Sequence, residues 1–325
     1  MKVLVGDIGG TKTGLALATR DGDGVGLELE RRYSSRDAAS LADIVEQYRN
    51  ETGAAADLAS FAVAGPVVNG RSRTTNLPWE LDADDLAKRL GLRRVGLLND
   101  LEAVAWGITA LSDDDLAVLQ PGAADAAGNA CVVAAGTGLG EAGLFWDGQR
   151  HHAFASEGGH TDFAAVDARE QALLAEFQDR YGHVSWERVV SGQGIADIYR
   201  FLAARQGGAH PPAIAEALDG GGDVAAAVAE EAGAGCPLCN ETLDLFVRFY
   251  GREAGNAGLK YMALGGVYLG GGIAPKNLER LRGPAFLDAF LDKGRMRDLM
   301  ERMPVSVILN PRTPLFGAAR SMAEP

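Results

Sequence analysis

Two glycine turns, each set between short apolar runs, constrain the fold of this chain more than any other feature. In the first half, an apolar run at residues 3–5 leads into GDIGGT at residues 6–11, and a second run reaches residue 17. In the second half, residues 131–135 lead into GTGLG at residues 136–140, and a second run spans residues 142–146. Each pattern predicts a strand, a turn and a second strand. Their recurrence indicates an internal duplication with a phosphate held between the halves.

The first turn has the chemistry of a site for metal-bound phosphate. Glycines lack the Cβ atoms that would keep backbone N–H groups away from an anion. Asp7 and Thr11 add a carboxylate and a hydroxyl beside them. The alternative is a hairpin whose glycines serve only its turn.

Two better-known phosphate motifs do not fit these turns. Residues 6–13 nearly match the Walker pattern, but Thr11 replaces its second glycine, and residues 21–24 form a turn before a helix could follow. Residues 138–143 satisfy the dinucleotide pattern GxGxxG after a strand. The chain again reaches a turn, at residues 147–148, too soon for the required helix.

Length and composition limit the classes of protein that fit. A chain of 325 residues is long enough for two domains. Glycine makes up 43 of the 325 residues, about twice the usual share of ~7%. The net charge of −13 argues against a nucleic-acid partner. We find no apolar run of membrane-spanning length and no signal-peptide layout, so no membrane association and a cytoplasmic location are expected.

A strand predicted at residues 95–98 ends in Asn99 and Asp100 and leads to a helix over residues 101–111. Ligands of α/β sheets collect at the carboxyl ends of strands, so this amide and this carboxylate are well sited for chemistry. The alternative for Asp100 is the capping of the helix N-terminus, which is the commoner role of such a residue.

Further helices are predicted at residues 41–48, 81–90, 213–218, 224–231 and 241–263, and residues 112–115 are expected to start a solvated helix. Residues 73–79 are expected to form an ordered loop. Its Trp79 either lines a ligand cleft or caps the core of the small domain, and the core is favoured.

The cysteines and histidines suggest two weaker alternatives. Cys236 and Cys239 have CxxC spacing without a second pair, so incidental thiols at a helix start are favoured over a redox or metal role. His151, His152 and His160 make a zinc site conceivable. Without zinc, Glu157 and a neutral His160 provide hydrogen-bonding groups for a polyol.

Six stretches in this order resemble the bacterial glucokinases of the actin-like ATPase and sugar kinase superfold. They are GDIGGT at 6–11, LLND at 97–100, AGTGLG at 135–140, SEGGHTDF at 156–163, GHVSWERVVSG at 182–192 and GGVYLGGGIAPK at 265–276. Each is modest alone, but their joint order is specific and covers residue 3 to about residue 317. The related ROK group carries a cysteine-rich zinc motif after the histidine that corresponds to His160, and this chain lacks it.

The resemblance implies an α/β fold: a two-domain, actin-like (ribonuclease H-like) duplication with a cleft between a small and a large domain. The small domain would comprise residues 1–111 plus about 303–325, and the large domain residues 112–302. The family also implies a homodimer, with glucose and ATP as the small-molecule partners and Mg²⁺ as the metal.

The resemblance further implies ATP-dependent phosphorylation of glucose on its 6-hydroxyl. Asp100 would accept the hydroxyl proton, and Asp100, Asn99, Glu157, His160 and Glu187 would bind the sugar. Glu187 would otherwise be read as a solvated helix charge. Asp7 would hold Mg²⁺ through water. The nucleotide would be bound by Gly6, Asp7, Ile8, Gly9, Gly10, Thr11, Gly136, Thr137, Gly138, Gly271 and Gly272.

Three other functions remain open at this stage: a kinase for mannose, fructose or an N-acetylhexosamine, a non-catalytic sugar-sensing regulator, and a nucleotide hydrolase. The regulator would need a DNA-binding segment, against which the acidic charge argues. Two residues depart from the family pattern. Lys12 replaces a common asparagine, and Glu141 follows AGTGLG in place of a small apolar residue. Lys12 would add a phosphate contact and Glu141 would put an acid near the nucleotide loop, so both bear on nucleotide affinity more than on reaction type.

Overall fold

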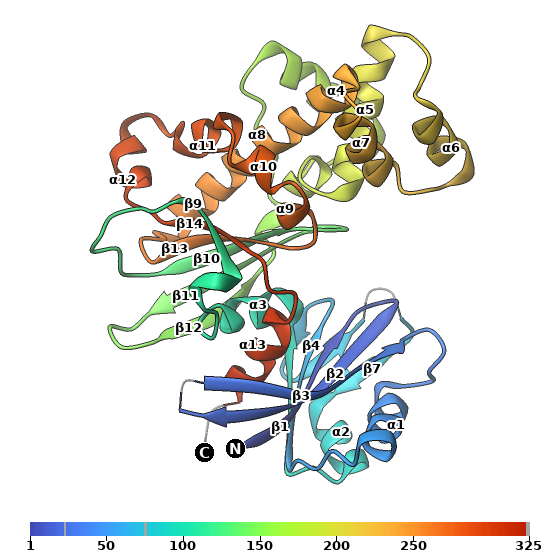
Figure 1. Ribbon diagram of the computed structural model, residues 1–325, viewed down its shortest axis with the longest axis vertical. Helices are drawn as coiled ribbons and strands as arrows, with labels where there is room; N and C mark the ends of the chain where they lie inside the picture. Colours follow the sequence, from blue (N-terminus) through green and yellow to red (C-terminus); the bar gives the residue numbers. More distant parts are fainter. Residues whose placement is uncertain (23, 75–76, 323–325) are drawn as a thin grey trace. The chain divides into compact units, whose positions relative to one another are not determined.

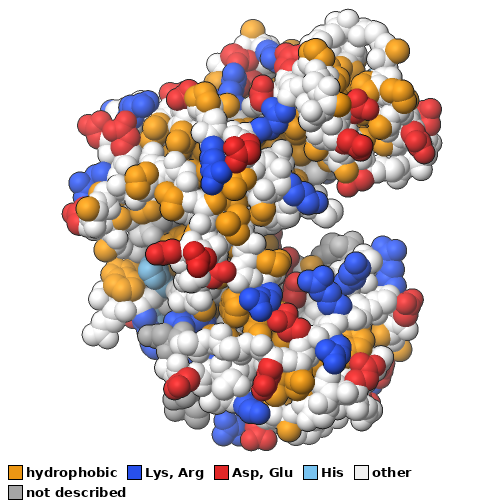
Figure 2. All heavy atoms as spheres, viewed as in Figure 1, with side chains coloured by type: hydrophobic (Ala, Val, Ile, Leu, Met, Phe, Trp, Pro, Cys, Tyr) orange, Lys and Arg blue, Asp and Glu red, His pale blue; other side chains and the backbone are white. Residues whose placement is uncertain are grey.

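A computed structural model describes residues 1–22, 24–74 and 77–322, and the chain forms two compact units (Figure 1). The first unit comprises Met1–Leu116, Ala142–Ala155 and Leu309–Pro325, and the second comprises Ala117–Glu141 and Ser156–Ile308. The boundaries expected for a small and a large domain remain a prediction. On the face shown in Figure 2, acidic and basic side chains are interspersed over both units.

The first unit is built on a five-stranded sheet with the order β3-β2-β1-β4-β8. The strands are β1 (Lys2–Ile8), β2 (Lys12–Asp21), β3 (Gly24–Ser34), β4 (Leu58–Val63) and β8 (Arg94–Asn99). β1 and β2 form an antiparallel hairpin around the first glycine turn, which confirms the predicted strand, turn and strand. β1, β4 and β8 run parallel.

Side chains that alternate along β1 supply the two cores of this unit. Leu4 faces a core formed with helices α1 (Leu41–Thr52) and α2 (Ala83–Leu90), which cover one side of the sheet. Val3 and Val5 face a second core with the terminal helix α13 (Thr313–Ser321). The last helix therefore packs against the amino-terminal sheet. Trp79 is buried in the first core, as favoured from the sequence.

A small sheet precedes α2 and consists of β5 (Val67–Val68), β6 (Arg71–Arg73) and β7 (Glu80–Asp82). Asn69 and Gly70, with φ of 52° and 71°, make the tight turn between β5 and β6. Residues 75–76 of the expected loop lie outside the described residues. The helix expected from residue 81 begins at Ala83, because Leu81 pairs with β6 and the Asp82 side chain caps the helix.

The second sheet has the order β12-β11-β10-β13-β14-β9. Its strands are β9 (Leu116–Gln120), β10 (Ala130–Ala135), β11 (Leu139–Trp146), β12 (His151–Ser156), β13 (Gly266–Gly270) and β14 (Val305–Ile308). Apart from β9, the order of these strands along the chain and across the sheet repeats that of the first sheet. The repeated order supports the internal duplication predicted from the two glycine turns.

The prediction of a helix starting at residues 112–115 is wrong. These residues form a single 3-10 turn, η1 (Asp113–Asp115), before strand β9. Ser112 closes the turn by donating its backbone N–H and its hydroxyl to Oδ2 of Asp115, at 2.9 and 2.8 Å. The carbonyl of Asp115 then accepts the N–H of Leu309, so the turn does not continue as a helix.

The second unit is mainly helical outside its sheet. Its helices are α4 (Ala168–Tyr181), α5 (Gly192–Gln206), α6 (Pro212–Gly220), α7 (Val224–Gly233), α8 (Pro237–Tyr261), α9 (Ile273–Lys276), α10 (Leu278–Leu281), α11 (Pro284–Leu291) and α12 (Arg297–Glu301), with 3-10 turns η2 (Gly158–His160), η3 (Trp186–Arg188) and η4 (Gly294–Met296). The predicted helices at residues 213–218, 224–231 and 241–263 correspond to α6, α7 and α8.

Helix α8 is a core element of the second unit. Phe246, Phe249 and Tyr250 are fully buried, and the Tyr250 hydroxyl donates to the carbonyl of Val133 in β10 at 2.8 Å. Cys236 is the N-cap residue of α8, and Cys239 is buried in the first turn. Burial and the neighbouring Cys236 raise the pKa of Cys239 to about 12, which disfavours the thiolate that redox and metal chemistry require.

Helix α3 (Asp100–Ile108) crosses α13 at very close range, and both contact surfaces contain glycine. A Cβ atom on Gly317 would overlap the carbonyl oxygen of Ala103, and one on Gly107 would overlap that of Thr313. Two glycines therefore allow α13 to fix the helix that carries Asp100. Helix α3 ends at Ile108, before residue 111, where the predicted helix ended.

We expect Gly317→Val to destabilise the first unit by ~1–3 kcal/mol, because the added side chain has no space between the helices. The measurement is the free energy of unfolding in denaturant. Gly14→Ala is the control, since a Cβ there meets nothing within 4 Å. Equal stability of both variants would show that the helices separate without cost.

Candidate active site

The parallel strands of the first sheet bring two of the predicted site segments to one edge. The register places Ile8 beside Val63, and Val63 beside Asn99, so these three strand ends form one row. Neighbouring strands lie ~4.8 Å apart, which puts the ends of β1 and β8 about 10 Å from each other. The first glycine turn and the Asn99-Asp100 pair therefore leave the sheet at the same edge.

The first glycine turn is held by a serine from the end of β3. The Gly9 N–H donates to the Lys12 carbonyl at 3.0 Å. Ser35 is buried, donates its hydroxyl to the Gly9 carbonyl at 2.8 Å, and donates its N–H to the Thr11 carbonyl at 2.9 Å. Its hydroxyl also lies 2.9 Å from that of Thr13. Within the turn held in this way, Gly10 is half-buried and Thr11 is exposed.

Asp7 sits at the end of β1 beside this turn, and its carboxyl is costly to ionise where it lies. Burial raises the pKa of Asp7 above its ordinary value, while the positive charge of Arg32 acts in the opposite direction. A divalent cation would remove this penalty by supplying an opposite charge. The residue therefore fits the predicted Mg²⁺ role on chemical grounds.

Asn99, and not Asp100, is the N-cap of α3, so the capping alternative for Asp100 is wrong. The Asn99 side-chain oxygen accepts the N–H groups of Leu101 and Glu102 at 2.9 and 3.3 Å, and its amide group donates to the Gly65 carbonyl at 3.1 Å. Asp100 occupies the first helical position and accepts the Leu101 N–H at 2.9 Å. With its oxygen engaged, Asn99 has amide N–H donation as its remaining means of binding a ligand.

In the second unit, the glycine turn and Glu187 are in direct contact. The Gly136 N–H donates to the Gly138 carbonyl at 2.9 Å, and the Glu187 carboxylate accepts the Leu139 N–H at 3.0 Å. A Cβ atom on Gly138 would overlap that carboxylate. The structure thus joins a predicted nucleotide-binding turn to a predicted sugar-binding side chain. Glu187 is in the 3-10 turn η3 and not on a solvated helix face.

Glu157 and His160 lie at the two ends of the 3-10 turn η2, with Nε2 of His160 3.9 Å from Oε2 of Glu157. Both side chains are exposed. Residues 161–163 are joined to residues 184–186 by backbone hydrogen bonds, including Phe163 N–H to the Val184 carbonyl and Trp186 N–H to the Thr161 carbonyl. This pairing holds η2 beside η3. Glu157, His160 and Glu187 are therefore gathered in one region of the second unit.

Gly271 and Gly272 follow β13, whose residue Gly270 pairs with Ala134 of the parallel strand β10. Gly271 has φ of 78°, and a Cβ atom there would overlap the Ala135 carbonyl oxygen. Around Gly272, a Cβ would meet nothing within 4 Å. These two glycines leave the sheet beside the turn at residues 136–138, as a shared nucleotide site requires.

The histidines that suggested zinc have other neighbours. His152 contacts Asp147 with an Nε2 to Oδ2 distance of 2.7 Å, and the ring of His151 packs on Trp146 with centroids 4.8 Å apart. Within the described residues, no group of three potential His, Cys, Asp or Glu ligands is close enough to hold a metal. Among the helices that the structure describes, none has the length and hydropathy to cross a bilayer.

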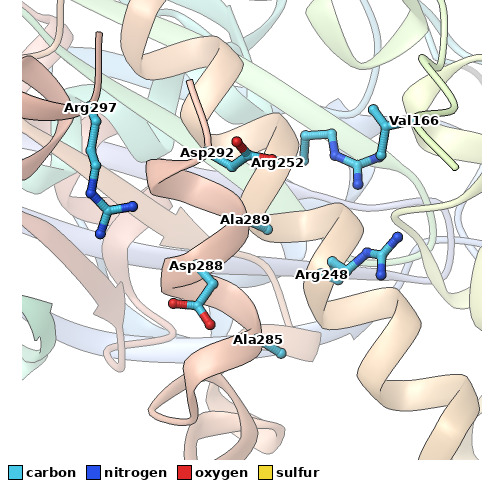
Figure 3. A pocket seen from close by; sticks show the side chains of 8 residues that line it. All are labelled: Val166, Arg248, Arg252, Ala285, Asp288, Ala289, Asp292 and Arg297. Carbon is cyan, nitrogen blue, oxygen red and sulfur yellow. The ribbon is translucent and has the colours of Figure 1, made fainter. Parts of the chain in front are cut away.

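A cavity of about 550 Å³ lies elsewhere in the second unit, and its lining includes Arg248 and Arg252 of α8 and Asp288 and Ala289 of α11 (Figure 3). It contains none of the predicted site residues. Arg252 binds the buried Glu170 through two nitrogens at 2.8 and 3.1 Å, and Arg248 pairs with Asp167 and Glu170. These ion pairs engage both guanidinium groups.

The glucokinase family model matches residues 4–325. The chain belongs to the glucokinase family. Among its relatives, the glucokinase of Nostoc punctiforme is 41% identical over 98% of this chain and 97% of its own. The glucokinase of Synechocystis sp. is also 41% identical, over 99% of this chain and 98% of its own. The resemblance predicted from the six motifs is confirmed.

Solved structures confirm the predicted fold class. A glucokinase from an Antarctic psychrotroph superposes with a TM-score of 0.84 at 33% identity, covering 99% of this chain and 98% of its own. A ROK family glucokinase from Streptomyces griseus, in complex with glucose and AMPPNP, has a TM-score of 0.62 at 20% identity and covers 98% of each chain. At 20% identity the Streptomyces griseus structure shows a likeness of fold alone. The likeness to the psychrotroph glucokinase supports assignment to the non-ROK branch.

Ser35 is the structural contributor that sequence reasoning did not identify. It follows the first turn by 24 residues, counted from Thr11, and lies in no glycine-rich motif. The pairing of β2 with β3, in which Lys12 lies opposite Ser34, brings it to the turn. Only knowledge of this register could have indicated its role.

We expect Ser35→Ala to weaken nucleotide binding and to destabilise the chain by ~1–3 kcal/mol. The Gly9 carbonyl and the Thr13 hydroxyl would each lose the Ser35 hydroxyl as a hydrogen-bond partner. Ser34→Ala, at the exposed neighbouring position, is the matched control. Calorimetric titration with ATP and a denaturant curve give the two quantities. Unchanged ATP affinity in Ser35→Ala would assign the serine a role in stability alone.

Proposed function

We propose that this chain is an ATP-dependent glucokinase that phosphorylates the 6-hydroxyl of D-glucose, with Asp100 as general base. The observation that carries the proposal is the family match over nearly the whole chain. Relatives crystallised with glucose, or with glucose and AMPPNP, support sugar and nucleotide as the two ligands. The positions of the site residues within each unit are compatible with this chemistry.

Asp100 is suited to the role of base by its position. It is half-buried at the first turn of α3, where Leu101 donates to one carboxylate oxygen, Oδ1. That bond helps to fix the side chain, and its carboxylate would accept the proton from the attacking hydroxyl. Phosphoryl transfer needs alignment and charge stabilisation more than covalent participation by the protein.

The remaining sugar hydroxyls would bind to Asn99, Glu157, His160 and Glu187. Asn99 would donate an amide N–H, because its oxygen caps α3. The two glutamates would accept hydrogen bonds from sugar hydroxyls, and His160 would donate or accept a hydrogen bond depending on its tautomer. A sugar that left such polar groups unpaired would lose binding energy, and this cost is the basis of selectivity among hexoses.

ATP would be held through the two glycine turns and the glycines after β13. The contacts would come from Gly6, Asp7, Ile8, Gly9, Gly10, Thr11, Gly136, Thr137, Gly138, Gly271 and Gly272. Mg²⁺ would neutralise phosphate charge, with Asp7 holding it through water.

By family analogy we also propose a homodimer, which light scattering of the eluted protein would test.

Asp100→Asn is expected to lower kcat by about 10²-fold or more, because an amide cannot accept the proton, while glucose binding stays measurable. A coupled assay for ADP release gives kcat, and calorimetric titration gives glucose affinity. Asp114→Asn, in the exposed η1 turn, is the control. Activity of Asp100→Asn within tenfold of the parent would remove Asp100 as the base.

Removal of Mg²⁺ with a chelator should abolish activity, and Asp7→Asn should shift the Mg²⁺ concentration for half-maximal rate upwards by about tenfold, the equivalent of ~1.4 kcal/mol.

The assay is run across mannose, fructose and N-acetylglucosamine as well as glucose. A faster reaction with one of these sugars would replace glucose as the substrate. ATP hydrolysis that ignores all sugars would instead indicate a hydrolase.

A further inference from the structure

Behind the turn that carries Glu157 and His160, the second unit contains a buried pair of carboxyl groups. Glu141 of β11 is 1% exposed, and Glu253 of α8 is fully buried. Neither takes part in the reaction described above. Glu141 is also one of the two residues that depart from the family pattern in sequence.

The Glu141 carboxyl is in contact with the backbone of the η2 turn. A Cβ atom on Gly158 would overlap Oε2 of Glu141, and one on Gly159 would overlap the carbonyl oxygen of Leu139. The turn therefore rests directly on residues 139–141 of β11. Leu139 also donates to Glu187, so the same short segment supports all three predicted sugar-binding side chains of this unit.

The hydrogen bonds around the carboxyl groups of Glu141 and Glu253 require one of the two groups to hold a proton. Both oxygens of Glu253 have donors: Asn256 at 2.8 Å and Lys260 at 3.3 Å. Neither oxygen of Glu141 has a donor among the described residues. Two carboxylates can only accept. A proton on Glu141 converts its contact with Glu253 into a hydrogen bond and removes one buried charge.

Other titratable groups face this pair from several elements. Cys131 of β10 and Tyr261 of α8 lie close to both glutamates, and Lys260 of α8 partly offsets their charge. Lys293, which donates to the Arg252 carbonyl at 3.1 Å, faces Glu253. Burial raises the pKa values of Cys131 and Tyr261 further above neutrality. They stay protonated near pH 8.

We propose that Glu141 is a positioning residue for the sugar: in its protonated form it bonds to Glu253 and supports the 157–160 turn from behind. Ionisation would place a second negative charge against Glu253 and the backbone of Gly158, and the turn would move. The effect would fall on binding of the sugar and not on binding of ATP. The inference rests on the proposed function, because it deepens the role of the same sugar-binding residues.

Burial, followed by the field and the hydrogen bond of Glu253, raises the pKa of Glu141 to about 8. The folded chain therefore keeps a proton that the unfolded chain releases near the ordinary value of 4.5. Stability should fall as pH rises from the lower value to the upper one, and support of the turn should be lost above about pH 8.

The test compares kcat/KM for glucose, and KM for ATP, between pH 6 and about 9.5 in the parent and in Glu141→Gln, which keeps the shape and a donor without titrating. The parent should lose kcat/KM for glucose about tenfold above pH 8, the size of effect that ~1.4 kcal/mol produces. Glu141→Gln should lack that decline, and KM for ATP should not follow it in either protein. The same alkaline decline in both proteins would overturn the proposal.

Lys293 is the necessary second variant, because burial lowers the pKa of Lys293 to about 8 as well. Lys293→Gln should retain the alkaline decline. If Lys293→Gln loses the decline and Glu141→Gln keeps it, the lysine is responsible and the proposal is wrong. A parent with no glucose phosphorylation at pH 7 would instead refute the proposed function, and thermal unfolding across the same pH range would still test the proton on Glu141.

A second experiment tests the contact without relying on pH. Gly158→Ala should raise KM for glucose at pH 7, because its Cβ displaces the turn from Glu141. The double variant Gly158→Ala with Glu141→Ala should recover part of that loss. A double variant as weak as, or weaker than, Gly158→Ala alone would contradict direct support of the turn by the carboxyl.

Discussion

The parallel pairing of β1 with β4 and of β4 with β8 is the constraint on which the first unit depends. Ile8, Val63 and Asn99 form one row across the sheet. All later features follow from that row: the glycine turn continues β1, and α3 begins directly after Asn99. Shifting the register of one strand by one residue would turn its side chains to the opposite face. The roles proposed for Asp7 and Asp100 depend on this register.

In the second unit, close approach of backbone plays the corresponding part. Gly138, Gly158, Gly159 and Gly271 each lie where a Cβ atom would overlap a carboxylate or a carbonyl oxygen. Their function in the fold is the absence of a side chain, and positive φ is a requirement at Gly271 alone among them. The 3-10 turns η2 and η3 can therefore pack on the start of β11.

Polar groups buried behind the two turns differ in how they are satisfied. Ser35 is neutral and its hydrogen bonds are complete, so it supports the first turn without dependence on pH. Glu141 is satisfied only when it holds a proton. Burial disfavours a charge that has no partner, and a neighbouring carboxylate adds to that effect. The first glycine turn and the η2 turn thus have supports of different chemical character.

The sequence alone determined the hairpins, the duplication, the family and the candidate residues, because glycine turns between apolar runs are local features and the order of six motifs is specific. It misplaced short elements such as β9 and the start of α2, where a side-chain cap or a pairing with distant residues decides the outcome. It gave no sign of Ser35 at the first turn, and it read Glu141 as a neighbour of the nucleotide. Only tertiary structure decided these points, since strand register and burial bring together residues far apart in the chain and set which of them carries a proton.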